Sequence, residues 1–593
     1  MTERNLTTGM RRLSRRPLAL SLALVTSLVL TEARAQDPQP ESGTGREVKT
    51  SVTAGEFMVS AANPLAARAG YDVLKAGGTA IDAAVAVQMM LNLVEPQSSG
   101  IGGGAFLLYW DAKNRTLETY DGRETAPAAA TPEYFLKEDG TPMGFWDAVV
   151  GGRSVGVPGT LRLLEVAQGK HGNKNWGELF RPAIDLAEAG FEISPRMAKS
   201  IAAAQEKSLD KFSTAKAYFF NEDGTPREAG SLLKNPEFAV TLRAIAEGGA
   251  DVFYKGDIAR DIVAAVQATT ENPGILSVED FAAYQVKQRD PVCTLYRVYK
   301  VCGMGPPTSG GLTVGQMLGI LGHFDLKAMG PGPQAVHLFA EAGKLAYADR
   351  GLYMADSDFV RMPTKGLLDA DYLTGRAGLI KPDGAMSKAD PGTPPWKDAA
   401  LRAPDSGLER PGTSHFVIRD SYGNAVSMTT TIETGFGSRV MVRGFLLNNE
   451  LTDFSRAPEK DGKVIANRVE AGKRPRSSMA PTIVFDAEGE PVLLIGSPGG
   501  SRIINYVAKT LVAVLDWKMD IQDAIDLGHF VNRNGATDLE IGTGVESYRD
   551  ALEALGHEVK IVDLNSGLHG IVIAKDRLTG GADSRREGVV LGE

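Results

Sequence analysis

A glycine–threonine pair, Gly412–Thr413, begins the stretch that is richest in side chains able to do chemistry. The stretch reads G-T-S-H-F-V-I-R-D-S-Y-G-N-A-V-S-M-T-T-T-I-E, and L-L-N-N-E-L-T-D-F follows it. A threonine hydroxyl is a weak nucleophile until a base takes its proton. The threonine's own α-amino group can be that base when the residue is the first of its chain, because this group titrates near neutral pH.

Thr413 lies inside the chain, so this chemistry requires cleavage of the Gly412–Thr413 bond. Glycine before the threonine is compatible with self-cleavage, because it adopts strained geometry readily and crowds the bond least. The alternative is that the pair only begins a β-strand, and the two residues alone do not decide the matter. Their surroundings lead us to interpret Thr413 as the N-terminal nucleophile of an amidase.

The pattern of elements changes at Thr413. Residues 384–412 are rich in Pro, Gly and Asp with little periodicity, which predicts an exposed loop. After this loop, H-F-V-I-R-D and A-V-S-M-T-T-T-I, joined by S-Y-G-N, predict a hairpin with a Gly-Asn turn. A small antiparallel sheet unit is therefore expected from Thr413 onward.

The region before the loop predicts mixed helices and strands. F-M-V-S-A predicts a strand, and the helix that follows should end at Gly77-Gly78. A helix over about 80–93 is apolar on most faces and should be buried. Gly100–Ala105 fits a dinucleotide fingerprint but follows a helix and opens a strand, so we interpret it as a tight turn. Residues 160–290 are predicted to be mainly helical.

Composition and charge argue against a nucleic-acid-binding protein. The chain has 593 residues, 43% of them hydrophobic, and a net charge of -9, without the basic stripe of a nucleic-acid binder.

Residues 1–35 resemble a cleaved export signal, with basic residues from Arg11 to Arg16, an apolar run from Leu18 to Leu30, and Ala33-Arg34-Ala35 as the cleavage site. The alternative is an N-terminal membrane anchor, for which the apolar run is short.

The predicted compartment follows from this signal. We expect an exported protein, periplasmic or secreted, with a flexible lead-in over residues 36–50. No later apolar run reaches 18 residues, so no stable membrane span is expected after signal removal. Cys293 and Cys302 could form a disulfide in such a compartment, the alternative being two buried thiols. Neither the cysteines nor the histidines show metal-ligand spacing, and no metal or cofactor is expected.

Motifs along nearly the whole chain after the signal resemble one family. G-G-T-A-I-D-A-A-V-A, P-Q-S-S-G-I-G-G-G, D-G-R-E-T-A-P, G-V-P-G-T and P-P-T-S-G-G precede Gly412. T-S-H-F-V, L-N-N-E-L-T-D-F, K-R-P-R-S-S-M-A-P-T-I and G-S-P-G-G-S-R follow it. So many motifs in order are unlike a chance match, and together they resemble the γ-glutamyltranspeptidases, also described as glutathione hydrolases.

The resemblance implies an α+β fold, a four-layer αββα sandwich of the N-terminal nucleophile hydrolase type. It also implies autocatalytic cleavage between Gly412 and Thr413, giving a large subunit (residues 51–412 after the lead-in) and a small catalytic subunit (residues 413–593). The subunits should remain associated as a heterodimer, because their strands form shared sheets.

The resemblance also assigns roles residue by residue. Thr413 would be the nucleophile, Thr431 its hydrogen-bond partner, and Gly499 and Gly500 the backbone donors of the oxyanion hole. The substrate would be a γ-glutamyl compound such as glutathione, and the acyl group would pass to water or to an amino-acid or dipeptide acceptor. The donor's α-carboxylate and α-ammonium would be held by two groups of residues: Arg123, Ser477 and Ser478 for the carboxylate; Glu433, Glu450 and Asp453 for the ammonium.

Two departures from the family and three alternative functions remain. Some members have Asn or Gln at the positions of Glu433 and Glu450, so this ammonium site is unusually acidic, and repulsion should raise one pKa when the site is empty. The segment from Asp453 to Ser477 lacks the tyrosine found in the longer lid loop of some members. A glutaryl (cephalosporin) acylase or poly-γ-glutamate depolymerase would share the fold. A non-catalytic binding protein would not retain the full site.

Overall fold

The computed structural model describes Met1 and residues 43–396, 402–405 and 407–593. Apart from Met1, the predicted export signal lies outside the described residues, as does the lead-in up to residue 42. The rest of the lead-in, residues 43–50, forms neither helix nor strand. It is nevertheless attached to the C-terminal segment, because the Glu47 N–H donates to Ser584 O at 2.9 Å and Lys49 Nζ donates to Asp583 O at 2.8 Å.

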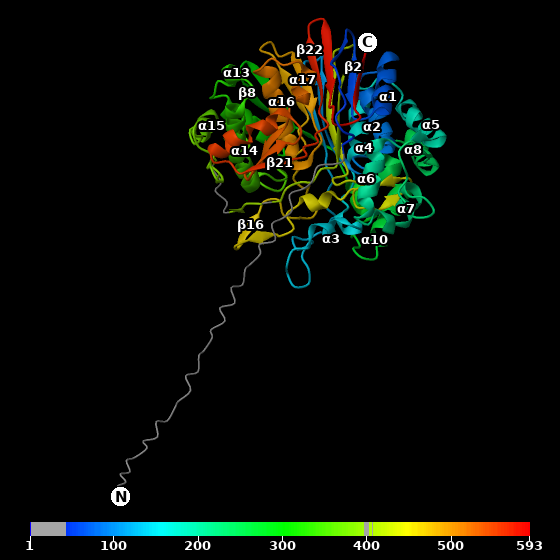
Figure 1. Cartoon of the computed structure of the whole chain (residues 1–593). Coiled ribbons are helices and arrows are strands. Elements are labelled where there is room, and N and C mark those ends of the chain that lie inside the picture. The colour runs from blue at the N-terminus through cyan, green and yellow to red at the C-terminus, as the bar shows by residue number, and fades with distance from the viewer. Residues whose placement is uncertain (2–42, 397–401, 406) are drawn as a thin grey trace. The chain divides into compact units, whose positions relative to one another are not determined.

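Two seven-stranded antiparallel sheets form the centre of the molecule (Figure 1). The first comprises, in spatial order, β1 (Val52–Ala54), β23 (Arg577–Ala582), β22 (His569–Ala574), β18 (Pro491–Gly496), β17 (Thr482–Phe485), β9 (Tyr299–Gly303) and β8 (Val292–Tyr296). The second comprises β24 (Val589–Gly592), β2 (Met58–Ala61), β11 (Thr413–Arg419), β12 (Ala425–Thr431), β3 (Gly104–Asp111), β4 (Thr116–Gly122) and β7 (Lys287–Arg289).

The sheets pack face to face through β11 and β12 of the second sheet against β18 and β22 of the first. Helices cover the outer face of each sheet, on the left and right sides of the view in Figure 1. On the second sheet these are α1 (Pro64–Lys75), α2 (Ala80–Val94) and α4 (Thr160–His171). On the first sheet they are α12 (Gly310–Leu321), α16 (Ile503–Leu515) and α17 (Ile521–Asp526), with α14 (Pro333–Tyr353) packed on α12.

The remaining elements lie around these layers. The other α-helices are α3 (Phe145–Val149), α5 (Arg181–Ala189), α6 (Pro195–Gln205), α7 (Ser213–Phe219), α8 (Pro236–Gly248), α9 (Asp251–Tyr254), α10 (Asp257–Gln267), α11 (Val278–Ala283), α13 (Leu326–Met329), α15 (Ala370–Ala377) and α18 (Arg549–Ala554). Small sheets are formed by β5 (Phe191–Glu192) with β6 (Leu232–Leu233), β13 (Met441–Val442) with β14 (Phe445–Leu446), β10 (Arg402–Ala403) with β16 (Lys463–Ile465) and β15 (Glu459–Lys460), and β19 (Phe530–Asn532) with β20 (Thr537–Glu540) and β21 (Val559–Val562).

Local sequence explains where the first helices begin and end. Asn63 caps α1 by accepting from the Leu65 N–H, and the chain leaves this helix through Gly77, whose φ of 77° favours glycine. Thr79 and Asp82 form a reciprocal capping box at the start of α2. Every residue of α2 is buried, as its apolar composition predicts.

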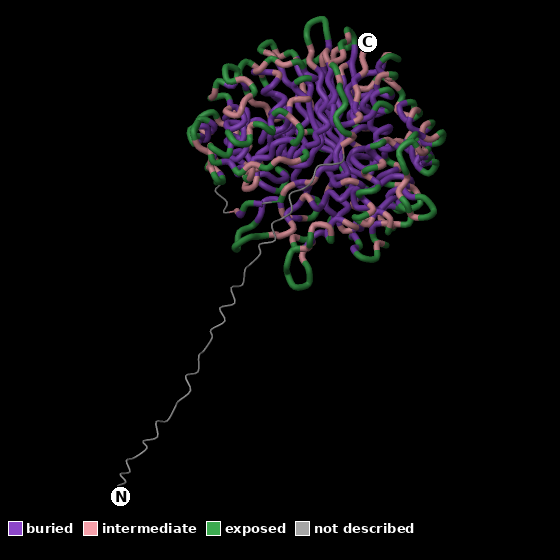
Figure 2. The backbone as a smooth tube through the Cα atoms, viewed as in Figure 1, coloured by how far each residue is buried: buried purple, intermediate pink, exposed green. Residues whose placement is uncertain are grey.

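The strands after Thr413 do not form a separate sheet, which corrects the expectation from local pattern. β11 and β12 are inserted between β2 and β3 of the second sheet, both of which precede Gly412. β17, β18, β22 and β23 likewise complete the first sheet together with β8 and β9. Both halves of the chain therefore contribute to both sheets. Figure 2 shows that buried residues fill this shared centre.

Candidate active site

Thr413 and Thr431 face each other across the central hairpin. Thr413 is the first residue of β11, Thr431 is the last residue of β12, and the antiparallel register pairs them directly. Thr413 Oγ1 donates to Thr431 Oγ1 at 3.4 Å, and both residues are buried. The hairpin predicted from the sequence therefore brings together the two threonines that the resemblance paired.

Thr431 also contacts the bond that precedes Thr413. Its hydroxyl donates to the carbonyl oxygen of Gly412 at 2.7 Å and accepts from the Glu433 N–H at 2.8 Å. A donor in this position stabilises the negative charge that develops on a carbonyl oxygen under nucleophilic attack. The hydroxyls of Thr413 and Thr431 and the carbonyl oxygen of Gly412 thus form one chain of hydrogen bonds.

Crowding is the reason that position 412 requires glycine. A Cβ atom there would lie 1.8 Å from the carbonyl oxygen of Glu433 and 2.6 Å from the carbonyl carbon of Thr434. These are backbone atoms and cannot rotate aside. The φ of Gly412 lies outside the left-handed region. Glycine is therefore needed here because there is no room for a side chain, and not because the backbone is strained as the sequence suggested.

The linker, residues 384–412, is buried where it approaches Gly412, so the prediction of an exposed loop is wrong for this last part. Asp405, Glu409 and Gly412 are all buried. Upstream, β10 pairs in parallel with β16 of the β15–β16 hairpin. The composition of the loop predicted irregular structure, but it could not show burial that comes from residues distant in sequence.

The predicted oxyanion donors lie in a tight loop before α16. Gly499 and Gly500 have φ values of 133° and 57°, which glycine adopts without penalty. A Cβ atom on Gly500 would lie 2.5 Å from the carbonyl carbon of Arg410. The Ser501 N–H, in the same loop, donates to the carbonyl oxygen of Glu409 at 3.0 Å. The linker therefore runs directly along the glycine loop.

Arg123 is enclosed by the carboxylates that were expected to face it. Its guanidinium is bonded to Glu450 through Nη1 and to Asp453 Oδ2 through Nη2 at 2.5 Å. It also donates to the carbonyl oxygens of Pro475 at 3.1 Å and Arg476 at 2.8 Å. The two halves of the predicted clamp for a zwitterion thus form ion pairs with each other.

Glu433 lies immediately beyond β12 in a left-handed conformation, with a φ of 77°. Such a conformation is costly for a residue with a side chain and persists only where its surroundings hold it. Here Asn449 Nδ2 donates to Glu433 Oε2 at 2.5 Å and the Arg410 N–H donates to Oε1 at 3.2 Å. The Asn449 side chain and the backbone of Arg410 together hold this carboxyl group.

Burial, more than repulsion, controls the protonation of the acidic cluster. Burial followed by the neighbouring Glu450 raises the pKa of Glu433 to about 8. Burial also raises the pKa of Glu450, against the opposing effect of Arg123, and raises the pKa of Asp453 well above its ordinary value. The sequence predicted one raised pKa from repulsion, whereas all three rise and desolvation is the leading cause.

A fourth acid, Glu124, was missed by sequence reasoning. It is fully buried, and its carboxylate lies 3.9 Å from Arg123 Nη1. Burial and the nearby Glu450 raise its pKa well above the usual range. Its position directly after Arg123 in D-G-R-E-T-A-P was the available signal.

Ser478 connects the site to a second arginine, Arg350. Ser478 Oγ accepts from Arg350 Nη2 at 2.9 Å and donates to Glu409 Oε2 at 2.9 Å. Ser477 Oγ accepts from the Met479 N–H at 3.1 Å. Arg350 and Glu409 were not singled out from the sequence. Arg350 is on α14, and no local pattern links it to these serines.

The predicted site residues, apart from Gly412 and Gly499, line one narrow pocket. Its volume is about 10 Å³, room for about one water molecule. Linker residues Glu409 and Arg410 form part of its wall, so the uncleaved chain fills the space beside Thr413. The other lining residues are Arg123, Thr413, Thr431, Glu433, Glu450, Asp453, Ser477, Ser478, Met479, Gly500 and Ile503.

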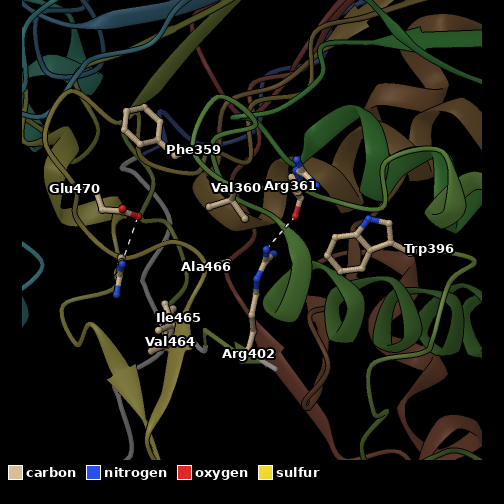
Figure 3. Close-up of a pocket in the computed structure, with 10 residues that line it drawn as sticks. Phe359, Val360, Arg361, Trp396, Arg402, Val464, Ile465, Ala466 and Glu470 are labelled. Atoms are coloured by element: carbon tan, nitrogen blue, oxygen red, sulfur yellow. Dashed lines mark hydrogen bonds and ion pairs between the residues drawn. The ribbon is translucent and has the colours of Figure 1, made fainter. Parts of the chain in front are cut away.

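A larger pocket of about 390 Å³ lies elsewhere and contains none of the predicted site residues (Figure 3). Trp396 and Arg402 line it from the linker side, and Val464 and Ile465 line it from the β15–β16 hairpin. Arg402 donates to the carbonyl oxygen of Arg361 at 3.0 Å across this pocket. The larger of these two pockets is therefore not the one in which the predicted site residues meet.

Comparison with known proteins identifies the family. The model of the gamma-glutamyltranspeptidase family matches residues 66–593. The chain belongs to the γ-glutamyltranspeptidase family. The match begins in α1 and includes every residue of the pocket around Thr413.

Relatives of this γ-glutamyltranspeptidase-family chain include proteins of two names. The glutathione hydrolase proenzyme of Bacillus subtilis (strain 168) is 39% identical over 586 residues, covering 97% of each chain. A cephalosporin acylase from Bacillus halodurans is similar in structure, with a TM-score of 0.82, 28% identity, and coverage of 94% of this chain and 99% of that one. Helicobacter pylori γ-glutamyltranspeptidase has a TM-score of 0.53 and 37% identity, over 60% of this chain and 97% of that one.

One group of potential metal ligands lies outside the pocket of this transpeptidase-family chain. His337 and Glu341, one turn apart on α14, meet His557. The histidines bond to each other through His337 Nδ1 and His557 Nε2 at 2.8 Å, and Glu341 accepts from Lys344 Nζ at 2.8 Å. The other nitrogen of each histidine and the other oxygen of Glu341 also have protein partners, so the group is a closed hydrogen-bond network.

Two further sequence-based expectations concern the rest of the chain. Cys293 and Cys302 are opposite each other on β8 and β9 and are joined by a disulfide. Within the described residues, no helix has both the length and the apolar character needed to cross a membrane.

Proposed function

We propose that this protein is a γ-glutamyltransferase and glutathione hydrolase. The observation that carries the proposal is the pocket in which Thr413 lies beside Arg123 and the acids Glu433, Glu450 and Asp453. A γ-glutamyl donor has a zwitterionic head group, and opposite charges on two sides of a pocket orient such a group. The similarity to glutathione hydrolase proenzymes along nearly the whole chain supports the same function.

We propose that the chain first cleaves itself. Thr413 Oγ1 attacks the carbonyl carbon of Gly412, and the C–N bond breaks as the nitrogen of Thr413 takes a proton. Water then hydrolyses the resulting ester, leaving a carboxylate on Gly412 and a free amine on Thr413. The large subunit, residues 51–412 after the lead-in, and the small subunit, residues 413–593, remain together as the two halves of a four-layer αββα sandwich.

In the processed enzyme, the free amine of Thr413 serves as the base for its own hydroxyl. Thr413 attacks the γ-carbonyl of the donor, the amine of the leaving group departs with a proton, and a γ-glutamyl ester remains. Thr431 holds the nucleophile, while the backbone N–H groups of Gly499 and Gly500 bind the oxyanion. Water or an amino-acid or dipeptide acceptor then takes the acyl group.

We propose that the donor's α-ammonium is bound by the acidic cluster and its α-carboxylate by Arg123, Ser477 and Ser478. Insertion of the zwitterion between Arg123 and Glu450 would exchange their mutual ion pair for two ion pairs to the ligand. Because the site is buried, these charge-assisted hydrogen bonds are stronger than they would be at the surface. The predicted export signal supports a location in the periplasm or outside the cell.

A second candidate function is glutaryl acylase activity, which the similarity to a cephalosporin acylase favours. A glutaryl group has no ammonium, so Glu433, Glu450 and Asp453 would have no charge to bind. A poly-γ-glutamate depolymerase is a further variant of the same chemistry. A steady-state comparison of γ-glutamyl and glutaryl anilides decides: we expect the γ-glutamyl anilide to have the higher kcat/KM. Faster glutaryl turnover would overturn the proposal.

A further inference from the structure

Glu409, four residues before Thr413, is held by buried partners of its own. Its carboxylate accepts from Arg350 Nη2, from Arg476 Nε at 3.1 Å and from Ser478 Oγ at 2.9 Å. All four of these residues are buried. Burial alone would raise the pKa of Glu409, but the charges of Arg350 and Arg476 lower it to about 2, so the group is a carboxylate at neutral pH.

The partners of Glu409 come from both sides of the linker. Arg350 is on α14, before the linker, whereas Arg476 and Ser478 come after the cleavage point. Within the described residues, Arg350 forms an ion pair with Glu409 only, and Arg476 binds Glu409 and, at 3.1 Å, Asp405. A buried ion pair is weak evidence for stability, because an apolar pair of similar volume is often as stable. What this one can supply is a fixed arrangement of the segments it joins.

The backbone beside Glu409 is fixed as well. Its carbonyl oxygen accepts from the Ser501 N–H at 3.0 Å, in the loop of the predicted oxyanion donors. The next residue, Arg410, donates its N–H to Glu433 Oε1 at 3.2 Å. The linker is therefore held through a side chain and through the backbone just before the bond to be cut.

Between these contacts and the scissile bond lie Pro411 and Gly412. Proline has a nearly fixed φ and no N–H to bond, whereas glycine has the most backbone freedom of any residue. The Gly412 carbonyl oxygen nevertheless lies 2.7 Å from Thr431 Oγ1, the group that polarises it. Misplacing reacting groups by about 1 Å can cost about 100-fold in rate. A fixed point at Glu409 limits where the flexible glycine can place this carbonyl.

We propose that Glu409 is a positioning residue for self-cleavage, whose side chain fixes the linker so that the Gly412 carbonyl stays against the Thr431 hydroxyl. The inference rests on the proposed self-cleavage and adds to it a residue that acts on the scissile carbonyl through the backbone of residues 410–412. This role ends when the bond is cut.

The first test follows self-cleavage of Glu409→Gln by densitometry of the precursor band over time. Glutamine keeps the size of the side chain but removes the charge that binds two arginines. We expect cleavage to slow by about 10- to 100-fold, the cost of a carbonyl displaced by up to about 1 Å.

Asp405→Asn is the matched control, because Asp405 is a buried linker carboxylate that binds the same Arg476 but lies farther from the bond. It should cleave nearly as fast as the unaltered chain. Equal slowing in Asp405→Asn and Glu409→Gln, or no slowing in Glu409→Gln, would overturn the proposal.

A double variant separates positioning from stability. Glu409→Leu with Arg350→Met removes a negative and a positive charge together, and Arg476 keeps Asp405, so no unpaired charge is left buried. In the Thr413→Ala background its Tm should lie closer to that of Thr413→Ala alone than the Tm of Glu409→Gln does. With Thr413 present, its cleavage should still be about tenfold slower or more. A stable double variant that cuts at the unaltered rate would overturn the proposal.

Glu409→Asp tests the same point in a chain that keeps its charge. The carboxylate still pairs with the arginines, but the side chain is one methylene shorter, so the linker must shift or the contacts must lengthen. We expect a folded precursor that cleaves about tenfold more slowly. Cleavage of Glu409→Asp at the unaltered rate would show that charge balance, and not position, is what Glu409 supplies.

These outcomes are distinct from failure of the proposed function. Slow cleavage in the Glu409 variants, with no γ-glutamyl turnover by the processed wild type, would refute the γ-glutamyl chemistry alone. A wild type that cuts itself no faster than the Glu409 variants would refute the positioning role alone. An uncut wild type would refute self-cleavage and the role of Glu409 together.

Discussion

The Thr431 hydroxyl donates a hydrogen bond of 2.7 Å to the carbonyl oxygen of Gly412. The same hydroxyl accepts the Thr413 Oγ1 proton at 3.4 Å, so one side chain contacts both the proposed nucleophile and the carbonyl it attacks. The register of a single hairpin creates this arrangement, because Thr413 and Thr431 are paired residues of β11 and β12.

Replacing Thr431 by valine should slow self-cleavage by about 100-fold, the usual cost of removing one donor to a developing oxyanion. Thr430→Val is the matched control. It is the neighbouring buried threonine, and within the described residues its Oγ1 has no hydrogen-bond partner. Densitometry of the precursor band over time measures both rates. Equal rates for the two variants would show that the bond from Thr431 to Gly412 does not assist cleavage.

Thr413→Ala should leave a single full-length chain on a denaturing gel, whereas the unaltered chain should give two bands. The reason is that alanine has no hydroxyl with which to attack Gly412. N-terminal sequencing of the smaller wild-type band should give Thr first, followed by S-H-F. An uncut wild-type chain, or a smaller band that begins at another residue, would refute the assigned cleavage point.

Gly412→Ala should destabilise the precursor, because the added Cβ would lie 1.8 Å from the carbonyl oxygen of Glu433. In the Thr413→Ala background, we expect a loss of about 1–3 kcal/mol in the free energy of unfolding, typical of overpacking. Gly435→Ala is the control, since its Cβ would meet nothing within 4 Å. Urea unfolding measures both changes. A Gly412→Ala variant as stable as Gly435→Ala would contradict the steric argument.

Glu433 should make the precursor less stable as pH rises. Burial raises its pKa from an ordinary value of 4.5 to about 8, so between these values the folded chain keeps a proton that the unfolded chain releases. The free energy of unfolding therefore falls across this window, by at most about 1.4 kcal/mol per pH unit for one proton, and levels off above it.

Urea unfolding of the Thr413→Ala precursor at pH 5, 6, 7 and 8 measures this slope. Glu433→Gln in the same background should flatten it, because glutamine cannot titrate. Parallel curves for the two proteins would show that Glu433 does not carry the raised pKa.

Much of the chemistry could be predicted from sequence because it lies in contiguous motifs. The hairpin around S-Y-G-N, the capped helices near the N-terminus and the disulfide-forming pair Cys293 and Cys302 follow from local pattern. The burial of the linker and the role of Glu409 could not be predicted in this way. Arg350, Arg476 and Ser478 surround Glu409 from positions 59, 67 and 69 residues away in the chain.

Sequence alone determined which groups are available: a threonine after a glycine, a row of acids, an arginine and a glycine-rich turn. Their order in the chain also determined the resemblance to a family, since motif order does not depend on knowing the fold. Tertiary structure alone decided their protonation and their partners. A carboxyl group's pKa depends on how far it is removed from water and on which charges lie near it, and both are set when distant segments pack together around Glu433, Arg123 and Glu409.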